Sequence, residues 1–71
     1  MHWTHIQNDW KHWSGKVREE WGMLTDADVQ AVAGKRDLLI GKIQQRYGVA
    51  RDEAERQIRN WIENVEAENP R

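Results

Sequence analysis

Apolar residues in the N-terminal third of this chain recur at intervals of three and four positions. At about 100° per residue this spacing places them on one face of a helix, so an amphipathic helix is predicted there. Gly22 lies near the end of this pattern and is predicted to end the helix in the left-handed conformation. The residues on the apolar face are Ile6, Trp10, Trp13, Val17, Trp21 and Leu24.

A second, short helix is predicted over residues 26–33. Thr25 is expected to be its N-cap, and Asp26 and Asp28 lie in the first turn, where the helix dipole favours acids. Gly34 then predicts a bend. The expected inward residues are Val29, Val32 and Ala33.

The third and fourth helices are predicted over residues 35–47 and 51–65. Gly48 is expected to end the third helix in the left-handed conformation. Ala50 stands at the N-cap of the fourth helix, where an alanine is a poor cap. The inward residues are Leu39, Ile40, Ile43 and Tyr47 in the third helix and Ala54, Ile58, Trp61, Ile62 and Val65 in the fourth.

The two halves of the chain resemble each other at a spacing of 26 positions. Each half predicts a helix, a glycine stop, an acidic helix start and a second helix. The fold class is therefore all-α: a small bundle of about four helices built as two helical hairpins, because one hairpin alone cannot bury its apolar side. The matching residues are Gly15-Lys16-Val17 with Gly41-Lys42-Ile43, Trp21-Gly22 with Tyr47-Gly48, Asp26 with Asp52, and Val32 with Ile58.

Tryptophan is expected to supply much of the core, because the chain has five tryptophans and no phenylalanine. Each indole can bury on the order of 200 Å². The chain has no cysteine, so the fold cannot be reinforced by disulfides. The predicted shared core is Trp10, Trp13, Val17, Trp21, Leu39, Ile43, Tyr47, Ile58 and Trp61.

One domain is predicted, over residues 8–65. Residues 1–7 are expected to be a frayed N-terminus, and residues 66–71, which are polar and hold the only proline, a disordered tail. No apolar run approaches the roughly 20 residues that a membrane helix needs. The first residues lack the basic and apolar parts of a secretory signal, so a cytoplasmic protein is expected.

Four short motifs stand out by their order and spacing. They are Trp21-Gly22, Leu24-Thr25-Asp26, Gly34-Lys35-Arg36-Asp37 and Arg46-Tyr47-Gly48. With these motifs the chain resembles the CsbD-like family, and the match runs from about Trp10 to Trp61. The resemblance implies a small bacterial helical protein associated with the general stress response, and it implies no reaction. The chain departs from the family at Ala50, where members often carry serine, and in its start rich in histidine and tryptophan, His2 to His5.

No catalytic, cofactor-binding or metal residue is predicted, and neither is a small-molecule substrate. His2 and His5 have a spacing that can hold a metal on a helix, and His12 follows seven residues later, but no cysteine joins them. They are interpreted as surface histidines, with adventitious copper or nickel binding as the alternative. The Gly-Lys pairs lack the rest of a phosphate-binding loop.

A basic stripe is formed on the third predicted helix by Lys35, Lys42 and Arg46. One interpretation is that these long side chains cover the edge of the core with their stems. The other is a site for an acidic partner or a phosphate backbone. The net charge of -1 does not favour nucleic acid.

Gly15 and Gly41 are equivalent in the repeat and lie about 160° from the core residues Val17 and Ile43. A glycine in the middle of a helix costs roughly 0.5–1 kcal/mol relative to alanine. Three explanations stay open: a kink, close packing of another segment of the chain, or contact with a partner.

The leading functional hypothesis is a non-enzymatic stress-response protein that acts through self-association or partner binding. The candidate contact residues are Gly15, Gly41, Lys35, Lys42 and Arg46. The alternative is a weak nucleic-acid-binding or nucleoid-associated protein that uses the basic stripe.

Overall fold

The computed structural model describes the backbone of residues 3–68 and the side chains of residues 3–65. This part of the chain contains helices and no strand, which confirms the all-α prediction. The count is five rather than four, because residues before Asp9 form a helix of their own. The helices are α1 (Trp3–Asn8), α2 (Trp10–Glu20), α3 (Asp26–Val32), α4 (Arg36–Tyr47) and α5 (Arg51–Glu68).

Helix α1 lies in the region that was expected to be a frayed N-terminus. Its Ile6 side chain is fully buried, and the Trp3 indole N–H donates a hydrogen bond of 2.7 Å to the carbonyl of Gly34. Asp9 has a non-helical ψ of 48°, so it separates α1 from α2 and divides the predicted first helix. Residues 3–7 are thus helical rather than frayed. The buried Ile6 side chain and the hydrogen bond from Trp3 to Gly34 hold them against the rest of the fold.

The predicted left-handed glycine is wrong at Gly22 and confirmed at Gly48. Among the described residues, positive φ angles occur at Ala33, Gly34 and Gly48, the last with φ 65°. Helix α2 ends instead at Trp21, whose φ of -117° and ψ of 80° turn the chain out of the helix. This residue leaves the helix while its side chain stays buried, so a left-handed residue is not needed after it.

Helix α3 begins as predicted, at a Thr25 N-cap. The Thr25 hydroxyl accepts from the Asp28 N–H, and the Asp28 carboxylate accepts from the Thr25 N–H, each at 3.1 Å. The helix ends in two successive left-handed residues, Ala33 with φ 52° and Gly34 with φ 81°. Ala33 is exposed rather than inward as predicted, and Gly34 is buried against the backbone of Gln7 in α1.

The core contains side chains from all five helices. Of the predicted members, Trp10, Trp13 and Tyr47 are partly buried and pack on its edge, and the others are buried. Helix α5 continues to Glu68, past the predicted end at residue 65, and residues 69–71 of the predicted tail lie outside the described part. The buried apolar residues are Ile6, Val17, Trp21, Leu24, Val29, Val32, Leu39, Ile40, Ile43, Ala54, Ile58, Trp61 and Val65.

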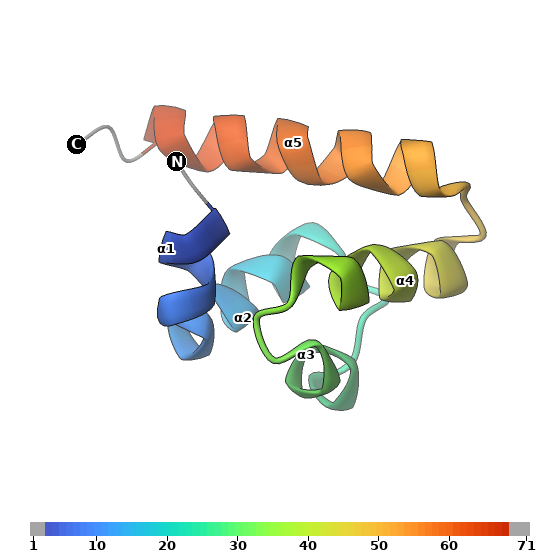
Figure 1. Cartoon of the computed structure of the whole chain (residues 1–71), viewed down its shortest axis with the longest axis horizontal. Helices are drawn as coiled ribbons and strands as arrows, with labels where there is room; N and C mark the ends of the chain where they lie inside the picture. The colour runs from blue at the N-terminus through green and yellow to red at the C-terminus, as the bar shows by residue number, and fades with distance from the viewer. Residues whose placement is uncertain (1–2, 69–71) are drawn as a thin grey trace.

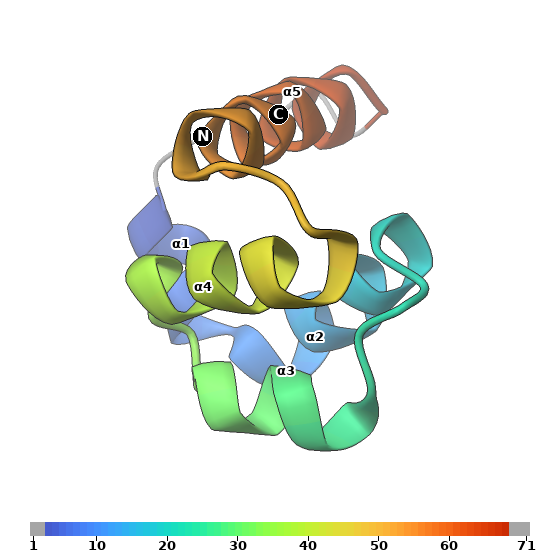
Figure 2. The ribbon, with the colours of Figure 1, turned by 90° about the vertical axis from the view of Figure 1, so that its right-hand side faces the viewer.

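The helices are arranged in layers, with α2 and α4 between α3 on one side and α5 on the other (Figure 1). Figures 1 and 2 together show that α5 crosses α4 at a steep angle instead of lying alongside it. The second half is therefore not the side-by-side hairpin that the repeat suggested. Helix α4 packs against both α3 and α5, so it connects the two outer layers.

Candidate functional site

The best-defined polar cluster is centred on Asp28 in α3. Its side chain is buried, yet its carboxylate pairs with two cations of α4. Arg46 donates from Nε to Oδ2 at 2.9 Å and from Nη2 to Oδ1 at 3.1 Å, and Lys42 Nζ lies 3.4 Å from Oδ1. This paired geometry is the strong, orienting form of an arginine–carboxylate contact.

The ionised form of Asp28 is strongly favoured by these contacts. Hydrogen bonds from Arg46 and from the Thr25 N–H, together with the charge of Arg46 and a contact from Lys42, hold the pKa of Asp28 well below its usual range. The same partnership raises the pKa of Arg46 above its ordinary value. The cluster is therefore a charged junction that joins the cap of α3 to the C-terminal half of α4.

The predicted basic stripe is divided by this junction. The structure brings Lys42 and Arg46 together on Asp28, whereas Lys35 is exposed at the N-cap of α4. Two of the three cations already face a carboxylate, which balances part of the positive charge of the stripe. The internal repeat could have indicated that Asp28 is buried. Asp28 is the equivalent of Ala54, and Ala54 is fully buried on the inner face of its helix.

Gly15 and Gly41 both lie on open helix surface. Each is exposed, and a Cβ added at either position would meet no heavy atom of the described chain within 4 Å, apart from its own helix. Close internal packing, one of the three explanations for these glycines, is thus contradicted for the described residues. The helical backbone of α2 and of α4 continues through both positions.

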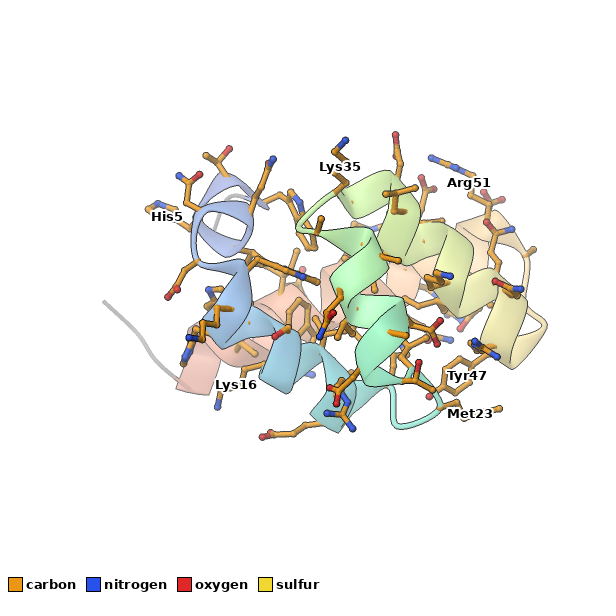
Figure 3. All side chains as sticks on the ribbon, turned by 90° about the horizontal axis from the view of Figure 1, so that it is seen from below. His5, Lys16, Met23, Lys35, Tyr47 and Arg51 are labelled. Carbon is orange, nitrogen blue, oxygen red and sulfur yellow. The ribbon has the colours of Figure 1, made fainter. Side chains whose placement is uncertain are left out.

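Two large apolar side chains are also exposed, and one lies beside a glycine. Leu38 is 47% exposed and precedes Gly41 by three residues, so the two occupy one face of α4. Met23 is 57% exposed, and its N–H donates to the Tyr47 hydroxyl at 3.0 Å. Figure 3 shows Met23 and Tyr47 next to each other, on the α2–α3 turn and at the end of α4.

A tryptophan cluster joins α2 to α5. The ring of Trp61 meets Trp13 and Trp21 edge to face, with ring centroids 5.8 and 5.4 Å apart. The Trp21 indole N–H donates to the Gln57 side chain at 2.9 Å, and Gln57 donates in turn to Glu53. Gln57, and then Arg56, lower the pKa of Glu53 from its ordinary value. The cluster positions α5, and sequence periodicity had already indicated its apolar members.

The sequence pattern of the CsbD-like family matches residues 4–56. The chain belongs to the CsbD-like family. This result confirms the resemblance found in the sequence motifs, and the match extends six residues further toward the N-terminus than Trp10, where that resemblance began.

Curated relatives of this CsbD-like chain are bacterial. It is 53% identical over 53 residues to the UPF0337 protein YjbJ of Escherichia coli strain K12, which covers 75% of this chain and 77% of the relative. It is 43% identical over 67 residues to the UPF0337 protein NE2439 of Nitrosomonas europaea, or 94% of this chain and 71% of the relative. These names carry a family designation and state no reaction.

The described histidines of the CsbD-like chain are His5 in α1 and His12 in α2. His12 packs edge to face on Trp13, with centroids 5.3 Å apart, and His5 is exposed in α1, whereas His2 lies outside the described residues. No group of three or more His, Cys, Asp or Glu side chains with metal-binding geometry occurs among the residues described. Within the same residues, no helix is long and apolar enough to cross a membrane.

Proposed function

We propose that this chain is a non-enzymatic bacterial stress-response protein that acts by binding another protein, either a second copy or a different partner. Membership of the CsbD-like family supports the bacterial stress-response setting. The observation that carries the binding role is the open space over Gly15 and Gly41. Each glycine is the equivalent of the other in the repeat, so the feature occurs twice.

The physical argument begins with the cost of these glycines. Each weakens its helix by roughly 0.5–1 kcal/mol relative to alanine, which is considerable for a domain of this size. The described chain does not use the space that the missing side chains leave. A partner can use it, because a helix surface without a Cβ allows another backbone to approach closely.

Helix α4 offers the more complete surface for such a contact. Leu38 adds an exposed apolar side chain on the face that carries Gly41. Burying a fully exposed leucine side chain contributes about 1.5–3 kcal/mol, so Leu38, which is 47% exposed, can contribute about half of that to an association. An apolar side chain beside bare backbone suits a packed protein contact better than a phosphate backbone, which needs available cations.

The proposal is tested with Gly15→Ala and Gly41→Ala. Each substitution is expected to stabilise the fold by a few tenths to about 1 kcal/mol through helix propensity, and to weaken association. Stability is measured by urea denaturation. Association is measured by sedimentation at micromolar concentration and by stress survival of bacteria that carry the variant.

Asn60→Ala is the matched control, because Asn60 is an exposed position in α5. It should also raise helix propensity and leave association and survival unchanged. Glycine variants that are more stable, yet associate and protect cells as the wild type does, would remove both glycines from the function. A steep loss of binding with added salt would instead indicate phosphate contacts.

A further inference from the structure

The connection between α4 and α5 is only three residues long, Gly48 to Ala50. Gly48 reverses the chain with φ 65° and ψ 35°, and its N–H donates to Gln44 O at 2.9 Å. Ala50 has no side-chain oxygen with which to cap α5, and the connection contains no proline. The break between the two helices therefore depends on one left-handed glycine and on the docking of α5.

The apolar pattern of α4 continues into α5 without a change of phase. Successive apolar residues follow at intervals of four, four, three, four, four, three and four, and the exposed Ala50 carries this pattern through the connection. At about 100° per residue they all fall within an arc of roughly 100°. A single straight helix from Arg36 to Glu68 would thus present one unbroken apolar stripe. The stripe is Leu39, Ile43, Tyr47, Ala50, Ala54, Ile58, Trp61 and Val65.

The equivalent connection in the first half, between α2 and α3, is held by polar contacts. Thr25 and Asp28 form a reciprocal cap, and the buried Asp28 pairs with Arg46 of α4. These contacts fix the start of α3 against α4, so α2 and α3 cannot merge into one helix without losing them.

The connection between α4 and α5 has a much weaker polar restraint. In the part of the chain whose side chains are described, α4 and α5 are joined by an ion pair of 3.3 Å between Arg51 and Asp37. These side chains are 54% and 82% exposed, and such surface pairs contribute little. The repeat places Ala54 where the first half has Asp28, so the second half lacks the charged junction.

The surface that receives α5 is apolar and well formed. Trp61 fits against Trp13 and Trp21, Ile58 is fully buried, and Gln57 accepts the Trp21 indole N–H. An α5 from a second copy would make these same contacts. The exchange would leave the core intact and add the hydrogen bonds of a continuous helix across residues 48–50.

We propose that two copies of this protein exchange α5 by straightening at Gly48, so that α4 and α5 become one helix and each α5 docks on the tryptophans of the other copy. A short hinge that is open to straightening is the usual origin of such exchange. The occupant of the α5 surface in the dimer is then α5 of the second copy. The proposal does not depend on the glycine faces of α2 and α4, so either proposal can fail alone.

The test uses the full chain with Gly48→Ala. Alanine is disfavoured in the left-handed conformation and favoured in a helix, so the substitution penalises the closed monomer and favours the straight form in both copies. The dimer dissociation constant measured by sedimentation equilibrium is expected to fall roughly a hundredfold. Gly22→Ala is the matched control, because Gly22 is equivalent in the repeat and lacks positive φ. It should leave the constant unchanged.

Exchange is distinguished from surface association by an intrachain distance. The chain has no cysteine, so spin labels can be placed at Lys35→Cys and Asn64→Cys, both exposed positions, and diluted with unlabelled protein. A continuous helix separates these backbone positions by about 44 Å at 1.5 Å per residue. The closed chain has a longest extent of 34 Å. A dimer that shows the long distance supports exchange.

Three results would overturn the proposal. The first is a folded Gly48→Ala protein that stays monomeric at millimolar concentration. The second is a dimer that keeps the short intrachain distance of the monomer. The third applies if Gly48→Ala does not fold, in which case the spin-labelled wild type is examined at roughly 1 mM. Absence of the long intrachain distance in that sample counts against exchange. A four-residue Gly/Ser insertion after Val49 is the control, because it should abolish any population with the long distance.

Discussion

The Asp28 carboxylate and the Arg46 guanidinium meet through two hydrogen bonds of 2.9 and 3.1 Å, although the residues lie 18 positions apart. One end of this contact belongs to the capping box of α3 and the other to the exposed side of α4. A residue that begins a helix is thereby also a tertiary restraint. The pair explains why two cations of the predicted basic stripe serve the fold.

This pair predicts a specific loss of stability in acid. The pKa of Asp28 is lowered in the folded chain, so the unfolded chain binds more protons as the pH falls past the ordinary value of 3.8. The stability contributed by Asp28 is thus present above about pH 4 and is lost progressively below it. The free energy of unfolding, measured in urea between pH 2.5 and 7, should decrease over this range.

Arg46→Gln should reduce that pH dependence, because it removes the main cause of the lowered pKa of Asp28. A smaller slope should remain from Glu53, whose pKa is also lowered. Arg18→Gln is the control, since it removes an exposed ion pair with Asp26. If the free energy of unfolding had the same pH dependence in the wild type and in Arg46→Gln, the lowered pKa of Asp28 would not depend on Arg46.

Trp21→Ala is expected to destabilise the protein severely. Trp21 is 2% exposed, packs on Trp61 and donates to Gln57, so its removal leaves a cavity and an unpaired amide under α5. The loss should be about 3–5 kcal/mol, a large part of the stability of a small domain. Thermal melting by circular dichroism measures it. A cooperative melt within a few degrees of the wild type would contradict this account of the core.

Gly34→Ala should detach α1 from the rest of the fold. Gly34 has φ 81°, and an added Cβ would come within 3.3 Å of the Gln7 backbone and 3.1 Å of its Cγ. Both the left-handed conformation and the contact oppose alanine, so a loss of about 1–2 kcal/mol is expected. Amide hydrogen exchange of residues 3–8 should accelerate. Gly41→Ala is the control, because this position faces open space and alanine should stabilise the chain there. If amide hydrogen exchange in α1 were unchanged in Gly34→Ala, the docking of α1 on Gly34 would be contradicted.

Signals carried by neighbouring residues were readable from the sequence. Apolar spacing predicted α2 to α5, Thr25 predicted the start of α3, and Gly48 predicted the left-handed end of α4. The motifs around Trp21-Gly22 and Gly34-Lys35 also identified the CsbD-like family. Each of these depends on side-chain periodicity, a local hydrogen bond or a local backbone preference, so a few adjacent residues contain the information.

Contacts between distant segments were decided only by the tertiary structure. Gly22 needed no left-handed conformation because Trp21 had already left the helix, and residues 3–8 became helical because Ile6 and Trp3 had a surface to pack on. The sequence by itself determined which faces of the helices are apolar, because that follows from their periodicity. Only the fold decided that Lys42 and Arg46 face Asp28 while Gly15 and Gly41 face open space, because partners depend on how helices pack in three dimensions.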